Sequence, residues 1–264
     1  SGSRVKRACH RGERHILDKE NIRIRILNCL RTIRALFLEA LYPSRCPVCN
    51  RILSDRKLRI CPVCSGSLHL IEEHYCLKCG KPLPETEEYC ADCKGRKREF
   101  CQGRGVFLYN MQMKNSLLRY KYYGSREYGR YYAEEIYRHV GTQIKNWNPD
   151  VLVPVPMTRR KKRIRGFNQA EDLAEKIGEL LQIPVAAGLA VKKKETKSQK
   201  KLNAAERMGN LKDAFGITES VQGLKILIVD DVYTTGSTIE TLAGCLKKNG
   251  AGEIYFVTLC IGQL

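Results

Sequence analysis

Two groups of side chains in this 264-residue chain have types and spacings that suit specific chemistry. Eight of the thirteen cysteines form four pairs, and two residues separate the partners in each pair. The pairs are Cys46/Cys49, Cys61/Cys64, Cys76/Cys79 and Cys90/Cys93. Two adjacent carboxylates, Asp230 and Asp231, follow the apolar run 226–229 and precede a turn rich in hydroxyl side chains. The cysteine pairs suit a metal ion, and the acidic pair with its turn suits a sugar phosphate.

The cysteine pairs provide enough thiolates for two tetrahedral zinc sites, which are structural because four thiolates leave no coordination position open. Eleven residues separate Cys49 from Cys61 and ten separate Cys79 from Cys90. This similar spacing favours two consecutive ribbons, although an interleaved pairing stays open. Redox-active pairs are disfavoured because no pair begins a helix after a strand. We therefore expect two structural Zn²⁺ ions.

The acidic pair stands where a buried strand is expected to end, and open α/β sheets bind their ligands at the carboxyl ends of strands. The backbone N–H groups of the turn 233–238 can converge on a phosphate at the start of a helix. Carboxylates would repel that phosphate, so we expect them to accept hydrogen bonds from ribose hydroxyls or to hold Mg²⁺ through water. The alternative is an ordinary buried strand followed by a capped helix.

The expected elements alternate along the second half of the chain. Apolar runs predict strands at 150–156, 224–231 and 253–261, and helical periodicity predicts helices at 168–181 and 237–249. This order indicates a mainly parallel sheet with flanking helices. Residues 157–163 are expected to form a basic loop, and residues 21–41 an amphipathic helix that ends before Pro43.

Three regions follow from these patterns. We expect a basic N-terminal extension over residues 1–42, a double zinc-ribbon module over 43–97 and an α/β domain over 98–264. The chain has 47 Lys and Arg against 28 Asp and Glu, a net charge of +19, which favours a nucleic acid, an acidic membrane surface or a phosphorylated substrate as partner. We expect a cytoplasmic protein, because neither a membrane span nor a secretory signal is evident and the cysteine spacing suits zinc rather than disulfides.

Residues 226–239 resemble the 5-phosphoribosyl 1-pyrophosphate (PRPP) binding motif of type I phosphoribosyltransferases, because they combine a strand, an acidic pair and a Thr-Thr-Gly turn. The segments 120–124, 153–157 and 165–169, with the cysteine pairs, extend the resemblance to ComF-like proteins in particular. Further matches are Thr196, Gln199, Leu202, Arg207, Asn210, Ala214 and Phe215. The resemblance covers about residues 43 to 261.

The resemblance implies an α/β fold of the phosphoribosyltransferase type and a role for each residue of the motif. Asp230 and Asp231 would contact the ribose hydroxyls of PRPP, with Mg²⁺ accompanying the ligand. Thr234, Thr235, Gly236, Ser237 and Thr238 would bind its 5-phosphate. The candidates for binding pyrophosphate are Arg159, Arg160, Arg165 and Arg207. Lys192 begins a segment where ComF-like chains often have Arg, which removes the bidentate fork of a guanidinium.

Tyrosines interleaved with cations over residues 107–137 suit single-stranded DNA, whose bases stack on aromatic rings while its phosphates pair with the charges. For an individual tyrosine, packing over the sheet is the simpler interpretation. The candidate DNA-binding cations are Lys121, Arg126, Lys161, Lys162 and Arg163. The helix expected at 21–41 could bind DNA phosphates, an anionic membrane or a protein partner, or pack on the zinc module.

The resemblance to ComF-like proteins implies a part in DNA uptake during natural transformation, beside a helicase-like ATPase at the inner face of the membrane. The rival hypothesis is an active, Mg²⁺-dependent phosphoribosyltransferase acting on a nitrogen acceptor. The sequence identifies neither an acceptor pocket nor a general base for that reaction. A scaffold that has lost ligand binding is the third alternative, disfavoured because the acidic pair and the turn are intact.

Overall fold

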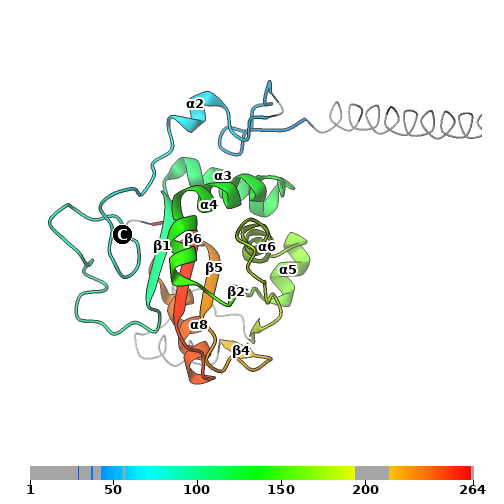
Figure 1. The fold of residues 1–264 in the computed structure, drawn as a ribbon. Helices are drawn as coiled ribbons and strands as arrows, with labels where there is room; N and C mark the ends of the chain where they lie inside the picture. The colour runs from blue at the N-terminus through cyan, green and yellow to red at the C-terminus, as the bar shows by residue number, and fades with distance from the viewer. Residues whose placement is uncertain (1–28, 30–36, 38–42, 56, 194–213, 263–264) are drawn as a thin grey trace, which may run out of the picture. The chain divides into compact units, whose positions relative to one another are not determined.

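A computed structural model describes residues 29, 37, 43–55, 57–193 and 214–262. By its contacts the chain divides into two compact units, one of Ser1–Cys46 with Asn50–Arg59 and one of Pro47–Cys49 with Ile60–Leu264. In the first unit, an antiparallel bridge joins Arg45 to Ile52. The second unit contains every helix and strand named below (Figure 1).

A four-stranded parallel sheet forms the centre of the second unit. Its strand order is β1 (Gln102–Leu108), β6 (Ile254–Ile261), β5 (Ile226–Tyr233) and β2 (Val151–Pro154). All three pairings are parallel, and the central strands β5 and β6 are almost completely buried. The predicted mainly parallel α/β sheet is therefore confirmed, and its three predicted strands correspond to β2, β5 and β6.

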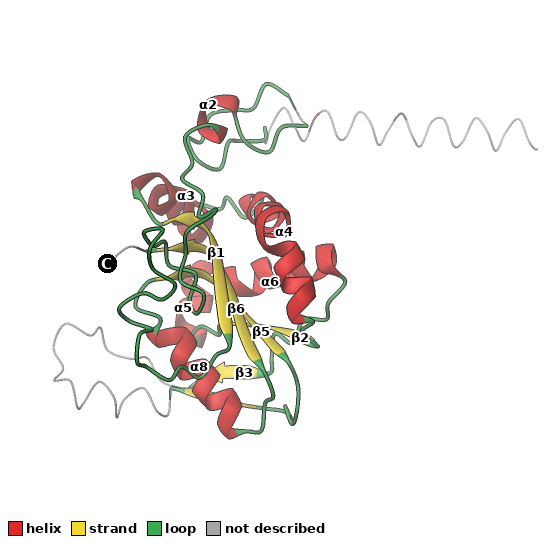
Figure 2. Ribbon diagram, turned by 60° about the vertical axis from the view of Figure 1, so that its left-hand side comes forward, coloured by secondary structure: helices red, strands yellow, loops and turns green. Residues whose placement is uncertain are grey.

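Helices cover both faces of this sheet (Figure 2). On one face, α3 (Met111–Tyr122), α4 (Tyr128–Trp147) and α6 (Gln169–Leu181) share a core with the strands. On the other face, α8 (Ser237–Lys248) packs beside a two-stranded antiparallel sheet of β3 (Ala190–Lys192) and β4 (Phe215–Ile217). The remaining helices are the short α2 (Pro62–Ser65) and α5 (Arg159–Arg165).

The helices predicted at 168–181 and 237–249 are confirmed as α6 and α8, but the loop predicted at 157–163 is wrong. Residues 159–165 form α5, which has no buried residue and therefore lacks the apolar stripe that identifies a helix in a sequence. Thr158 caps its first turn, and Gly166 ends it with a φ of +85°. The helix predicted at 21–41 lies outside the described residues except for Cys29 and Phe37.

The sequence patterns did not predict strand β1 of the parallel sheet, nor the short strands β3 and β4. The glycines of β1 leave room for side chains of β6, because a Cβ atom at Gly103 would collide with the ring of Phe256 and one at Gly105 with Ile261.

No helix in the described part of the chain is long and apolar enough to cross a membrane.

Candidate functional site

The acidic pair lies near the carboxyl end of β5, between strands β2 and β6. Asp230 is 9% exposed and Asp231 is 5% exposed, so both carboxyl groups are largely shielded from bulk water. The backbone N–H of Asp231 donates a hydrogen bond of 2.9 Å to Oδ1 of Asp230. Two acids so close together in a buried strand need cations or protons to balance them.

Lys121, near the end of α3, provides a cation for the pair by forming an ion pair with Oδ2 of Asp231. Burial disfavours the charged form of Asp231, but the charge of Lys121 and its hydrogen bond outweigh burial and lower the pKa of this carboxyl. Burial and then the charge of Asp231 raise the pKa of Asp230 well above its ordinary value. The two acids are therefore chemically different, with Asp231 as the anion and Asp230 as the group that retains a proton more easily.

The turn after β5 passes directly into α8. Gly236 caps this helix with a φ of +77°, and a Cβ atom at this position would collide with the hydroxyl of Tyr233. Thr234 and Thr235 are exposed, and the hydroxyls of Thr235 and Ser237 lie 3.1 Å apart. The first N–H groups of α8 have no intrahelical acceptor, so this turn presents donors to an anion, and Ser237 N meanwhile donates a 3.4 Å hydrogen bond to Oγ1 of Thr235. The structure thus places all seven residues predicted to bind PRPP in one continuous segment at the end of β5 and the start of α8.

A hydrogen-bond network extends from Asp231 to the surface. Gln169, at the start of α6, donates a 3.1 Å hydrogen bond to Oδ1 of Asp231, and Arg165 donates to Oε1 of Gln169. Arg165 also donates a 2.7 Å hydrogen bond to the hydroxyl of Tyr122 and lies over its ring. Because Tyr122 is 57% exposed, this network connects the acidic pair with the protein surface.

Each residue of the segment 165–169 has a structural role. Asn168 caps α6 by accepting a hydrogen bond from Ala170 N, and it donates to Val155 O at the end of β2. The ring of Phe167 packs edge-on against Tyr120, and Gly166 ends α5. The motif therefore positions both Arg165 and Gln169 beside the acidic pair.

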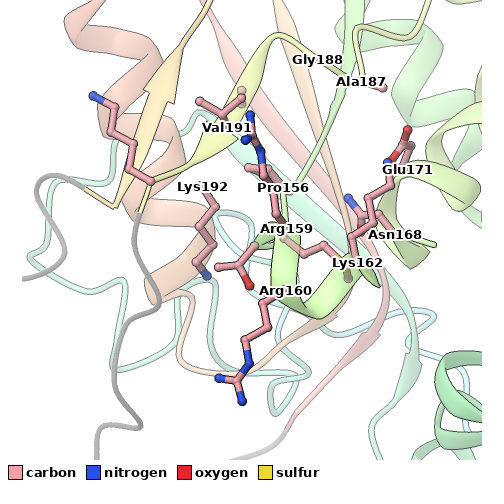
Figure 3. Close-up of a pocket in the computed structure, with 14 residues that line it drawn as sticks. Pro156, Arg159, Arg160, Lys162, Asn168, Glu171, Ala187, Gly188, Val191 and Lys192 are labelled. Atoms are coloured by element: carbon pink, nitrogen blue, oxygen red, sulfur yellow. The ribbon is translucent and has the colours of Figure 1, made fainter. Parts of the chain in front are cut away.

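A cavity of about 620 Å³ adjoins the carboxyl end of β2 (Figure 3). Arg159 and Arg160 of α5 line it from one side, and Lys192 of β3 lines it from the other. Burial and the charge of Lys161 lower the pKa of Lys192, whereas the charge of Asp230 opposes this change. Lys192 therefore lies near enough to Asp230 to be affected by its charge, and the cations of the cavity can attract an anionic ligand.

The other cations predicted for ligand binding have different positions. Lys162 pairs with Glu171 at 2.7 Å, and Arg126 pairs with the buried Asp172 at 2.7 Å. Lys161 and Arg163 are exposed on α5. Arg207 lies outside the described residues. Lys121, predicted from sequence as a DNA-binding cation, instead faces Asp231 with only 19% of its side chain exposed.

The cysteine pairs assemble in sequential order. Within each group of four, all Sγ atoms lie within 4.8 Å of one another. The groups are Cys46/Cys49/Cys61/Cys64 and Cys76/Cys79/Cys90/Cys93. The Sγ atoms of Cys49 and Cys61 are 3.8 Å apart, and those of Cys79 and Cys90 are 3.6 Å apart. Tetrahedral zinc with Zn–S bonds of about 2.3 Å requires sulfur atoms about 3.8 Å apart, so both groups fit Zn²⁺.

Two family models match separate parts of the chain. The double zinc ribbon domain family matches residues 37–94, and the phosphoribosyl transferase domain family matches residues 128–263. The chain is 33% identical over 213 residues to competence protein ComFC of Bacillus subtilis. The alignment covers 76% of this chain and 83% of that protein. The chain belongs to the ComF family. The predicted family is therefore confirmed.

Other ComF-family relatives have similar identity. DNA utilization protein YhgH of Salmonella typhimurium is 30% identical over 83% of this chain and 97% of its own length. Competence protein F of Haemophilus influenzae is 28% identical over 80% and 93% of the two chains.

Two solved structures also match parts of the chain. A purine phosphoribosyltransferase from Pyrococcus horikoshii matches with a TM-score of 0.33 and 21% identity, over 49% of this chain and 72% of that one. A phosphoribosylpyrophosphate synthetase from Mycobacterium smegmatis matches with a TM-score of 0.29 and 18% identity, over 51% of this chain and 33% of that one.

Proposed function

We propose that this ComF-family protein binds Mg²⁺-PRPP at the acidic pair and single-stranded DNA on a neighbouring surface, and that it acts in DNA uptake. The observation that carries the proposal is the arrangement at the end of β5. There, an ionised Asp231 is followed within a few residues by a glycine turn and the first turn of α8. A ligand that combines hydroxyl groups with a phosphate matches this arrangement.

PRPP would lie across the ends of β5 and β2. Its 5-phosphate would accept hydrogen bonds from the backbone of the turn 234–238, and its ribose hydroxyls would donate to Asp230 and Asp231. Its pyrophosphate would extend toward the cations of the cavity, which include Arg159 and Arg160. Mg²⁺, when bound with PRPP, would balance part of the pyrophosphate charge. Arg165 could reach the ligand only by leaving Gln169 or Tyr122.

The DNA-binding surface is proposed on the exposed ends of α3 and α5. Tyr123 is 76% exposed, so its ring is available for base stacking, and Tyr122 is 57% exposed with Arg165 over its ring. Lys161, Lys162 and Arg163 are exposed on α5, which contacts α3 through Arg165 and Tyr122. By contrast, Tyr120, Tyr128, Tyr131 and Tyr132 are buried in the core, as the packing interpretation predicts for most tyrosines.

The names of the relatives support a role in DNA uptake, because they are competence and DNA utilization proteins. We propose that the protein works in the cytoplasm at the inner face of the membrane, where incoming DNA arrives. A helicase-like ATPase of the uptake machinery is the proposed protein partner. The net charge of +19 favours association with DNA or with anionic lipid.

The second candidate is transfer of the phosphoribosyl group to a nitrogen acceptor. The cavity beside β2 favours it, because about 620 Å³ leaves space near the pyrophosphate cations. In this reaction the bond between ribose C1 and the pyrophosphate oxygen would break, and its electron pair would leave with pyrophosphate. C1 would carry positive charge as in an oxocarbenium ion, the acceptor nitrogen would form a bond to it, and the proton of that nitrogen would pass to solvent. The carboxylate of Glu171 lines the cavity but pairs with Lys162, so it is not a ready general base.

One experiment separates the two candidates. Pyrophosphate release from Mg²⁺-PRPP is measured with a panel of nucleobases and separately with single-stranded DNA, and the Asp230→Asn variant is the control. Release that depends on an acceptor and disappears in the variant would establish a transferase. Binding of PRPP without release would support a ligand-binding protein, and absence of both would overturn the proposed site.

A further inference from the structure

The second cysteine group shares a hydrophobic core with residues that flank the proposed phosphate turn, residues 234–238. This core contains Tyr233, which precedes the turn, and Ile239, which lies in the first part of α8. It also contains all four cysteines of the second group: Cys76, Cys79, Cys90 and Cys93. Among the described residues, the cysteines of the first group belong to neither of the two large cores. The second ribbon is therefore packed against the elements that form the turn.

The backbone of the second ribbon also contacts the sheet directly. Gly103 N of β1 donates a 2.9 Å hydrogen bond to Lys78 O. A Cβ atom at Gly80, whose φ is +74°, would lie only 2.8 Å from Gly103 O. The guanidinium of Arg104, also in β1, lies 3.3 Å from the ring centre of Tyr75. These contacts fix the ribbon against the edge of the sheet, so a structural change in the ribbon affects β1 directly.

Arg98, five residues after the last cysteine, connects the ribbon with α8. Its Nη2 donates a 2.8 Å hydrogen bond to Asp92 O, which lies between the last two cysteines. Its Nη1 lies 3.6 Å from Oε2 of Glu240, in the first turn of α8. The other oxygen of Glu240 accepts a 3.1 Å hydrogen bond from Glu99 N. The side chain of Arg98 is only 9% exposed, so this ion pair is shielded from solvent.

Glu240 has an electrostatic consequence for a phosphate. A helix N-terminus attracts anions, and a carboxylate in its first turn competes for the same donors and repels a second anion. Arg98 and Glu99 N hold this carboxylate against the ribbon and favour its charged form, whereas burial is the larger influence and raises the pKa of Glu240. Without Arg98, the negative charge of Glu240 would oppose the 5-phosphate.

The turn has a second support in Tyr233. The ring of Tyr233 stacks on Phe256 at 4.8 Å, and Phe256 contacts Phe100 edge-on at 4.9 Å. The hydroxyl of Tyr233 occupies the space where Gly236 lacks a side chain. Because Tyr233 shares its core with the second cysteine group, collapse of that group would remove packing beneath the turn.

We infer that the second zinc ribbon is the support of the phosphate turn, and that Arg98 is a positioning residue that neutralises Glu240 so that the turn accepts a phosphate. The second ribbon then belongs functionally to the PRPP-binding domain, and the domain boundary falls between the two ribbons. The effect on PRPP rests on the proposed function. The effect on the order of the turn does not depend on it.

The first experiment measures hydrogen exchange of the full chain without any ligand. The Cys90→Ser/Cys93→Ser variant removes two ligands of the second site, and Cys61→Ser/Cys64→Ser is the matched variant of the first site. We expect amides 234–240 to exchange at least about tenfold faster in Cys90→Ser/Cys93→Ser only, because this variant alone loses packing beneath the turn. The first-site variant should instead affect α3, since Ser116 and Arg119 bond to the carbonyls of Pro47 and Val48. Equal exchange of amides 234–240 in both variants, with α6 unchanged, would overturn the inference.

The second experiment keeps both zinc ions and changes the ion pair. Arg98→Met should weaken the binding of Mg²⁺-PRPP about threefold to tenfold, Arg98→Lys should weaken it less, and adding Glu240→Gln to Arg98→Met should restore it. A residue needed only for folding would not be rescued by removing the charge of its partner. Failure of the rescue, while wild type binds PRPP, would overturn the role of Arg98. If wild type does not bind PRPP, the proposed function fails, and the exchange experiment still decides whether the second ribbon supports the turn.

Discussion

The side-chain amide of Gln169 donates a 3.1 Å hydrogen bond to Oδ1 of Asp231, although 62 positions separate the two residues. The other carboxylate oxygen of Asp231 forms the ion pair with Lys121. Both oxygens are therefore fixed before any ligand arrives. Fixed polar groups bind a ligand with less loss of conformational entropy than mobile ones.

The contact between Arg165 and Gln169 predicts non-additive effects on PRPP binding. Gln169→Ala removes the hydrogen bond to Asp231, and Arg165→Met removes the group that orients Gln169. Each single variant should weaken PRPP binding severalfold. The double variant should also bind PRPP more weakly than wild type, but by a smaller factor than the product of the two single-variant factors. Isothermal titration of the four proteins in Mg²⁺ measures this cycle. Fully independent effects would show that Arg165 does not act through Gln169.

The buried position of Asp230 predicts a gain of stability when its charge is removed. Its pKa in the folded protein is raised by burial and by Asp231, so the folded state retains a proton that the unfolded chain loses above a pKa of about 3.8. Raising the pH from about 3.8 through the raised pKa of the folded state therefore destabilises wild type, whereas Asp230→Asn has no carboxyl group to lose a proton. At pH 8 the variant should have a free energy of unfolding about 1 kcal/mol higher, while it binds PRPP more weakly.

Urea unfolding at pH 5 and pH 8 checks this sign. The difference between variant and wild type should grow with pH, and Asp231 does not contribute to this trend because its lowered pKa keeps it ionised throughout. Asp150→Asn is a suitable control, since Asp150 precedes β2 at the opposite end of the sheet and accepts a hydrogen bond from Lys225 N. A wild type that is more stable than Asp230→Asn at pH 8 would refute the prediction.

The two cysteine groups predict a zinc content of two ions per chain. Cys61→Ser/Cys64→Ser and Cys90→Ser/Cys93→Ser should each reduce the content to one, because the groups share no ligand. Elemental analysis after gel filtration measures this directly. Loss of both ions from either variant would show that the two sites do not form independently.

The exposed cations of α5 predict a salt-dependent interaction with single-stranded DNA. Each phosphate contact contributes about 0.7 to the slope of log K against log salt concentration, so the triple variant Lys161→Gln/Lys162→Gln/Arg163→Gln should reduce the slope by up to about 2. Fluorescence anisotropy with an oligonucleotide at several salt concentrations measures the slope. Lys225→Gln, which changes an exposed lysine paired with Glu253, should leave it almost unchanged. An unchanged slope in the triple variant would exclude α5 from the DNA-binding surface.

Much of the α/β domain follows from local sequence patterns. The apolar runs that become β2, β5 and β6 have no competing interpretation, and Asn168 and Gly236 mark the starts of their helices. The sequence did not indicate β1, because Gly103 and Gly105 weaken a strand pattern and are explained only by their neighbours in β6. The capping residues Thr158 and Gly166 were the available signals for α5.

The phosphate turn was predictable because its residues are consecutive, whereas the contacts around it join distant parts of the chain. Lys121 was predicted to bind DNA because it is a cation among tyrosines, and only the packing of α3 brings it to Asp231. The same limit applies to Arg98 and Glu240, which lie 3.6 Å apart but belong to the second ribbon and α8. Sequence patterns identify local motifs, and tertiary packing decides which charges meet.

The most direct test of the proposed function is titration of the full zinc-loaded chain with PRPP, with and without Mg²⁺, in wild type and Asp231→Asn. The proposed site predicts saturable binding that requires Mg²⁺ in wild type and is weakened at least about tenfold in the variant, because a hydrogen bond to a charged group is lost. Asp150→Asn should bind like wild type. Equal affinity of wild type and Asp231→Asn, or no binding by wild type, would contradict the claim that the acidic pair of β5 binds PRPP.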